Sequence, residues 1–164
     1  MGDEHVQVPP VRYYEALARA RQGAGALITT GDGRIIMIDT TYRDFYEIPG
    51  GAVEHGETPA QACARECREE LHRDFEVGRL LAIDHQCDPG VQGDSVMYIY
   101  DGGSIDPQVL SGRGSDAEVA AVVAVTPEDL DSVTIPRLVD RIRGALTARA
   151  TGAVYEAENG RPRR

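Results

Sequence analysis

Short apolar runs separated by turn-forming residues predict a series of β-strands along the chain. Residues 24–30 and 34–40 flank Gly31-Asp32-Gly33, a sequence typical of a tight turn, and together they predict a β-hairpin. Further strands are expected at residues 45–48, 76–85, 95–100 and 119–125. Pro49-Gly50-Gly51 is expected to end the first of these, and Asp101-Gly102-Gly103 to form a turn after the third.

Two longer segments have the pattern of helices. The first runs from Thr58, which can cap a helix, through Pro59 to about His72. The second runs from Ile135 to Ala150, and its apolar side chains recur on one face. A short helical turn is expected at residues 127–130, and residues 11–21 fit either a short helix or an extended lead-in.

This order of elements predicts an α+β fold, arranged as an α/β/α sandwich around a mixed sheet of about six strands. One domain is expected over residues 11–153, with a flexible N-terminus at 1–10 and a disordered tail at 154–164. No apolar run approaches the ~20 residues of a membrane span, and the start lacks the features of a signal peptide. We therefore expect a cytoplasmic protein without a membrane partner.

The net charge and the composition limit the kinds of molecule that this protein is expected to bind. The net charge of −10 argues against a nucleic acid polymer, whose phosphates need a basic surface. All 17 basic residues are Arg, so any side-chain cation that grips a phosphate must be a guanidinium. The odd number of cysteines favours reduced thiols, and Cys63 and Cys67 are expected to fill the core rather than bind metal.

Three carboxylates share one face of the first predicted helix. Glu66, Glu69 and Glu70 follow one another at helical spacing, where like charges repel. A solvated acidic face could tolerate this repulsion, and a hard divalent cation such as Mg²⁺ would relieve it. Arg65 lies beside the cluster and can pair with Glu69 or reach back to Glu57 in the preceding loop.

Residues 51–73, GAVEHGETPAQACARECREELHR, resemble the Nudix box, G-x5-E-x7-R-E-U-x-E-E-x-G-U, where U is apolar. Six of the fixed positions are matched, and Cys67 fills the first apolar position. The matching residues are Gly51, Glu57, Arg65, Glu66, Glu69 and Glu70. His72 replaces the box glycine and Arg73 the last apolar residue. His72 can still take the left-handed conformation that ends a helix, or the helix can continue past it.

The resemblance implies a Nudix fold and a hydrolase of phosphorus-containing acid anhydrides that uses Mg²⁺, or Mn²⁺ in its place. The implied metal ligands are Glu66, Glu69, Glu70 and the carbonyl of Gly50. Gly51, Glu57 and Arg65 would support the box. A glutamate from a late loop is also implied, with Glu118 at the matching place and Asp116 in reserve. Glu66, Glu69 and Glu118 are the candidates for the general base.

The substrate is left open between several classes. The first is a nucleoside diphosphate linked to another group, such as ADP-ribose or a nucleotide sugar, for which Pro89 is a weak family hint. A modified nucleoside triphosphate and a prenyl or other non-nucleotide diphosphate are alternatives, as is a ligand sensor without catalysis. Arg43 and Tyr46 could bind the substrate, although Tyr46 suits the core equally well. Asp84 and His85 are weaker candidates at a strand end, and a homodimer is left open.

Overall fold

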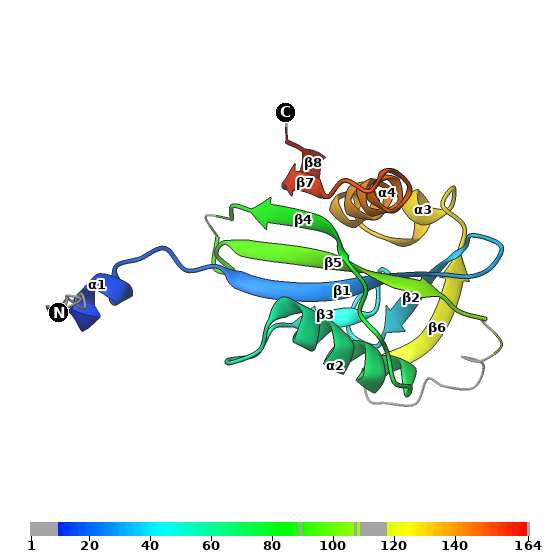
Figure 1. Ribbon diagram of the computed structural model, residues 1–164, viewed down its shortest axis with the longest axis horizontal. Coiled ribbons are helices and arrows are strands. Elements are labelled where there is room, and N and C mark those ends of the chain that lie inside the picture. The colour runs from blue at the N-terminus through cyan, green and yellow to red at the C-terminus, as the bar shows by residue number, and fades with distance from the viewer. Residues whose placement is uncertain (1–9, 89, 107, 109–117, 164) are drawn as a thin grey trace, which may run out of the picture.

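The computed structural model describes residues 10–88, 90–106, 108 and 118–163, and these fold around one mixed β-sheet (Figure 1). Over the described residues the sheet has eight strands in the order β6-β2-β1-β5-β4-β7-β8, with β3 paired to β1. The strands are β1 (Arg21–Thr29), β2 (Ile35–Thr40), β3 (Gly50–Ala52), β4 (Leu80–Gln86), β5 (Ser95–Ser104), β6 (Val119–Val125), β7 (Tyr155–Glu158) and β8 (Arg161–Pro162). The β1–β5 and β4–β7 pairs are parallel and the others antiparallel, which confirms the predicted mixed sheet.

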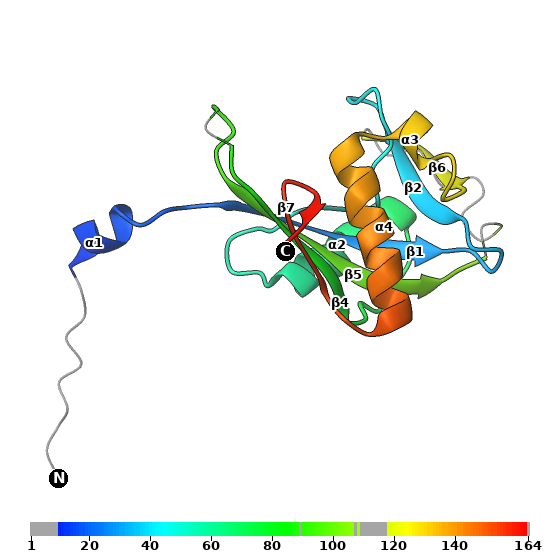
Figure 2. The ribbon, with the colours of Figure 1, turned by 90° about the horizontal axis from the view of Figure 1, so that it is seen from above.

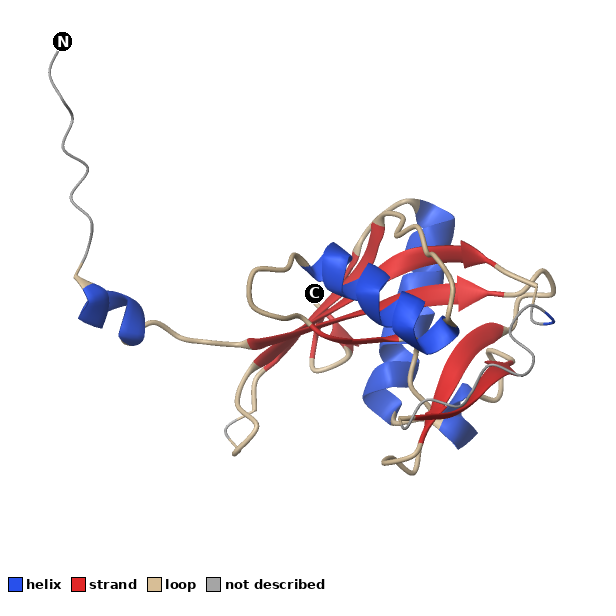
Figure 3. Cartoon of the chain, turned by 90° about the horizontal axis from the view of Figure 1, so that it is seen from below, coloured by secondary structure: helices blue, strands red, loops and turns tan. Residues whose placement is uncertain are grey.

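Helices cover both faces of this sheet. The described residues form α1 (Val11–Glu15), α2 (Pro59–Leu71), α3 (Leu130–Val133) and α4 (Pro136–Thr151). Figure 3 shows α2 crossing one face, and Figure 2 shows α4 crossing the other. The predicted α/β/α layering is therefore confirmed. No helix in the described part of the chain is long and apolar enough to cross a membrane.

The core is divided by the sheet into two apolar clusters. Alternate residues of β1 point to opposite faces, so Leu27 joins the cluster under α4 while Ile28 joins the cluster under α2. Burying such a side chain contributes about 1.5–3 kcal/mol relative to leaving it in water. Cys63 and Cys67 are buried thiols in the α2 cluster, as the sequence predicts.

Both ends of α2 are fixed by local chemistry. The Thr58 hydroxyl accepts a hydrogen bond from the Gln61 backbone N–H, and the Gln61 side chain accepts one from the Thr58 backbone N–H. The helix ends at Leu71, and His72 adopts the left-handed conformation with φ 49° and ψ 40°. The sequence left open whether His72 ends the helix or the helix continues past it; in the structure His72 ends the helix.

The expected strand at residues 45–48 is wrong, because this segment makes only a single bridge between Ile38 and Glu47. The strand forms instead at Gly50–Ala52, paired with β1. β3 and β1 approach so closely there that a Cβ on Gly50 would lie 2.3 Å from the Ala24 carbonyl oxygen. The expected turn at 101–103 is also wrong, since β5 continues to Ser104.

The sequence predicts a disordered tail at residues 154–164. In the structure, residues 155–158 and 161–162 of this segment form two strands. β7 pairs in parallel with β4, and β8 folds back onto β7. The Gly160 backbone N–H donates to the buried carboxylate of Asp84 at 2.9 Å, which fastens this hairpin to the sheet. The folded domain therefore extends past residue 153 to Pro162.

The start of the described chain lies apart from the sheet. The sequence allowed either a short helix or an extended lead-in at residues 11–21. Residues 11–15 form the short helix α1, and residues 18–20 lead into β1 without helical structure. Figure 2 shows α1 projecting away from the body of the molecule. Residues 1–9 of the expected flexible N-terminus (residues 1–10), Pro89 and Asp116 lie outside the described residues.

Candidate active site

Arg65 ties the loop before α2 to the helix, as the spacing predicts. Its Nε donates to Glu57 Oε1 at 2.8 Å, and its Nη2 donates to Glu57 Oε2 at 3.0 Å. Nη2 also donates to the Ala52 carbonyl at 3.0 Å, which adds β3 to the same contact. The Arg65 hydrogen bonds, helped by the Glu54 backbone N–H, lower the pKa of Glu57 to about 2.

The same guanidinium contacts two of the three helix carboxylates. Arg65 Nη1 donates to Glu66 Oε1 at 2.8 Å and lies 3.4 Å from Glu69 Oε2. Its hydrogen bond to Glu57 is the main reason that the pKa of Arg65 is raised above its ordinary value. Without a metal, Arg65 is therefore the cation that offsets the repulsion along this face.

Glu70 contacts the backbone of β3 and has a raised pKa. The Gly50 backbone N–H donates to its Oε2 at 2.8 Å. Burial raises the pKa of Glu70 to about 8, and the charges of Glu66, Glu47 and Glu118 add to this rise. A carboxyl group buried among other carboxylates is the setting that a divalent cation stabilises.

The box glycine makes room for a second carboxylate. A Cβ on Gly51 would lie 2.4 Å from Cδ of Glu66, so only glycine leaves the Glu66 carboxylate its place against β3. The third carboxylate, Glu69, is 57% exposed and is turned toward Arg65. Glu70 and Glu66 therefore lie against Gly50 and Gly51, two successive residues of β3.

The donor set fits a hard divalent cation. The groups that converge on β3 are carboxylate oxygens beside a glycine backbone, and such oxygen ligands suit Mg²⁺. Within the described residues, no three His, Cys, Asp or Glu side chains already stand in a ligand geometry. Glu66 and Glu69 contact Arg65 instead.

Glu118 is brought to this cluster from a distant part of the chain. It precedes β6, and its carbonyl accepts a hydrogen bond from the Thr41 backbone N–H at 3.0 Å. Its charge acts on Glu70 and also on Tyr42. The late glutamate that the sequence singles out therefore lies in the electrostatic neighbourhood of the helix carboxylates.

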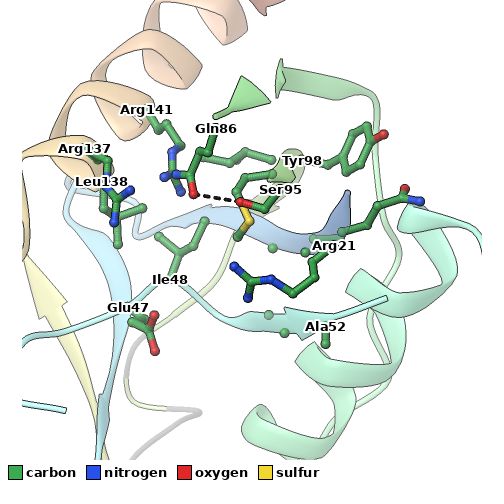
Figure 4. Close-up of a pocket in the computed structure, with 18 of the residues that line it drawn as sticks. Arg21, Glu47, Ile48, Ala52, Gln86, Ser95, Tyr98, Arg137, Leu138 and Arg141 are labelled. Carbon is green, nitrogen blue, oxygen red and sulfur yellow. Dashed lines mark hydrogen bonds between the residues drawn. The ribbon is translucent and has the colours of Figure 1, made fainter. Parts of the chain in front are cut away.

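A cavity of about 370 Å³ opens beside β3 (Figure 4). Its lining includes Gly50 and Gly51, so the cavity reaches the strand that contacts Glu66 and Glu70. Arg43, the candidate substrate contact, also lines it and forms an ion pair with Glu47 at 3.1 Å. Tyr46 is not among the lining residues and packs against the core cluster under α4, which is its other sequence-based interpretation.

A family model for the NUDIX domain matches residues 19–147, which is most of the chain. The chain belongs to the Nudix hydrolase family. Its Nudix box is the segment that holds Arg65 and the carboxylates against β3. The box departs from the family pattern at its end, where His72 takes over the conformation expected of glycine.

Other proteins are similar to this Nudix protein over parts of the chain. An RNA pyrophosphohydrolase from Halorhodospira halophila is 37% identical over 51 residues, or 31% of this chain. That match spans only 28% of the relative's length. The crystal structure of a UDP-X diphosphatase has a TM-score of 0.70 at 17% identity, covering 87% of this chain and 68% of that one. An ADP-ribose pyrophosphatase from Streptococcus suis has a TM-score of 0.59 at 18% identity, covering 85% and 99%. The two structures share the fold.

The cavity of this Nudix protein also contains residues that the sequence reasoning missed. Arg137 and Arg141 of α4 line it, together with Arg21 of β1. Arg141 is held by Asp84, which is completely buried rather than facing the cavity as a ligand. One signal was available, because Arg141 falls between Leu138 and Ala145 on the apolar face of the predicted helix. A charged residue at such a position needs a buried partner or a ligand.

Proposed function

We propose that this Nudix protein hydrolyses the diphosphate linkage of a nucleoside diphosphate joined to another group, such as ADP-ribose or a nucleotide sugar. Mg²⁺, or Mn²⁺ in its place, would be held by Glu66, Glu69, Glu70 and the Gly50 carbonyl. The observation that carries the proposal is that β3 lies against Glu66 and Glu70 and also lines the cavity. A diphosphate bound in the cavity would therefore lie beside them.

The chemistry of the site divides between the metal and the chain. When bound, a divalent cation polarises the phosphoryl oxygens and makes a bound water more acidic. Glu66, Glu69 or Glu118 would accept the proton of the attacking water at a carboxylate oxygen. Arg65 and Glu57 would keep the loop and helix in register, so that the carboxylates return to the same place after each turnover.

The cavity supports a substrate with two parts. Its volume of about 370 Å³ falls in the range of small-molecule sites. The walls combine apolar side chains such as Ile48 and Leu138 with several arginines. Such a lining suits a nucleoside or sugar attached to phosphate better than it suits a long prenyl chain.

A second candidate is the release of pyrophosphate from a nucleoside triphosphate. The RNA pyrophosphohydrolase relative favours it, although that likeness is confined to 51 residues. The two candidates share the carboxylate site and differ in what fills the cavity. They are therefore separated by their products.

The test is a panel of ADP-ribose, UDP-glucose, nucleoside triphosphates and a prenyl diphosphate, incubated with purified protein and Mg²⁺. We expect a nucleoside monophosphate from the first class, and loss of product with EDTA. Glu70→Gln is expected to abolish product release, because it replaces a proposed metal ligand with a neutral amide. Glu158→Gln, which changes an exposed carboxylate on β7, is the matched control. Tight nucleotide binding without turnover on any substrate would instead support a ligand sensor.

A further inference from the structure

Two arginines enter the cavity from α4. Arg137 and Arg141, here called the α4 arginine pair, are four residues apart and so lie on the same side of the helix. Figure 4 shows both side chains pointing from α4 toward the space above Ile48, on the side of the cavity away from β3. Nothing in the metal site described above requires them.

Arg141 is fixed in place by a buried carboxylate. Its side chain is only 8% exposed, and its Nε donates to Asp84 Oδ2 at 2.6 Å. The other oxygen of Asp84 accepts from the Gly160 backbone N–H at 2.9 Å, so this carboxylate cannot turn away. Within the described residues, Nη1 and Nη2 of Arg141 donate to no protein acceptor. These donors are held rigidly and left available.

Arg137 adds a second available cation beside the start of the helix. It is exposed, and it forms no ion pair or hydrogen bond within the described part of the chain. The N-cap residue Ile135 contributes no side-chain hydrogen bond, and the first turn of α4 has no acidic residue. Ile135, Arg137 and Leu138 at the start of this 16-residue helix line the cavity, so its positive end lies beside the cavity.

The other arginines of the cavity are already engaged. Arg43 is neutralised by Glu47, and Arg21 Nε donates to the Gln92 carbonyl at 2.8 Å. Among the described lining residues there are four arginines and one carboxylate, in a protein whose net charge is −10. With Arg141 paired to Asp84 and Arg43 to Glu47, Arg137 and Arg21 have no carboxylate partner among the described residues.

We propose that the α4 arginine pair binds an anionic group of the substrate that lies outside the diphosphate being cleaved. The proposal rests on the proposed function and narrows it. The preferred substrates are nucleoside diphosphate conjugates that carry a further phosphate monoester or a carboxylate. Asp84 is a positioning residue that aims Arg141 at this group.

Matched substrates that differ only in the anion test the proposal. UDP-glucuronate is compared with UDP-glucose, and ADP-ribose 2′-phosphate with ADP-ribose, so that carboxylate and phosphate are examined separately. In at least one pair, wild-type protein is expected to favour the anionic member by about 10-fold or more in kcat/KM, as a charged hydrogen bond provides. Arg137→Gln is expected to remove most of this preference by raising KM for the anionic member much more than KM for the neutral member.

Controls separate recognition from folding. Arg143→Gln changes an exposed arginine of the same helix that pairs with Asp131 and does not line the cavity, so it is expected to keep the preference. Asp84→Asn is expected to raise KM for the anionic member more than for the neutral member, with circular dichroism confirming the fold. An equal loss on both members of each pair in Arg137→Gln would overturn the proposal, because the arginines would then hold the shared diphosphate.

A binding measurement distinguishes failure of this inference from failure of the hydrolase function. Calorimetry in EDTA compares the affinities for UDP-glucuronate and UDP-glucose, and for the ADP-ribose pair, without turnover. Tighter binding of an anionic member that Arg137→Gln abolishes would support the anion site even if no substrate is cleaved. Equal binding of both members in both pairs, or binding of none, would overturn it.

Discussion

At the scale of single residues, the site depends on small groups placed against charged ones. Gly51 has no side chain because the Glu66 carboxylate occupies that space, and the Gly50 N–H is the hydrogen-bond partner of Glu70. The sequence identifies these glycines and glutamates by their spacing. It could not identify Asp84 as the partner of Arg141, because the two are 57 positions apart and only the packing of α4 on β4 brings them together.

Gly51→Ala tests the role assigned to the box glycine. The new Cβ would displace the flexible Glu66 side chain rather than the backbone, so the fold is expected to survive. Mg²⁺ affinity is expected to fall by about 10–100-fold, the usual cost of disturbing the support of a metal ligand. Calorimetric titration with Mg²⁺ measures this change. Gly31→Ala is the control, since nothing lies within 4 Å of a Cβ there, and an equal loss in both variants would contradict the prediction.

At the scale of elements, local sequence signals predict α2 far better than β3. Thr58, Gln61 and Pro59 specify the helix start by contacts within four residues, so the sequence was sufficient. The strand Gly50–Ala52 was not predicted, because two glycines favour a turn in isolation. Pairing with β1 overrides that preference, and the lack of side chains becomes what permits the close approach. The same reasoning applies to β5, which continues through a glycine pair.

The link between the box loop and α2 predicts a dependence on pH. The pKa of Glu57 is lowered to about 2 from an ordinary value of 4.5, so ionised Glu57 stabilises the folded state. This stabilisation is fully present above pH 4.5 and is lost as the pH falls through about 2. Glu57→Gln is therefore expected to unfold at a lower urea concentration than wild type near neutral pH, with the gap closing below pH 4.5. A gap that stays constant down to pH 2 would show that the Glu57–Arg65 contact does not stabilise the fold.

At the scale of the whole molecule, the C-terminal hairpin joins the sheet to the cavity. β7 covers the edge of β4, and Gly160 fixes the carboxylate that positions Arg141. The sequence suggests disorder because its last residues are rich in Arg, Gly and Pro. It does not reveal that the Gly160 backbone N–H donates a hydrogen bond to the buried carboxylate of Asp84. The N-terminal arm differs, since residues 10–22 are exposed throughout and α1 buries no residue.

These two ends of the chain therefore respond differently to truncation. Removal of residues 154–164 uncovers the β4 edge and leaves Asp84 Oδ1 without the hydrogen bond from Gly160, which alone costs about 1–3 kcal/mol. Urea denaturation is expected to show a loss of at least this size, together with weaker binding of any anionic substrate, because Arg141 loses its fixed position. Residues 10–19, the described part of the N-terminal arm, have only exposed side chains, so removal of residues 1–19 is expected to change the free energy of unfolding by less than about 0.5 kcal/mol. If both truncations had the same small effect, the hairpin would not be an integral part of the Nudix domain, and the buried pair would have to be maintained by α4 and β4 alone.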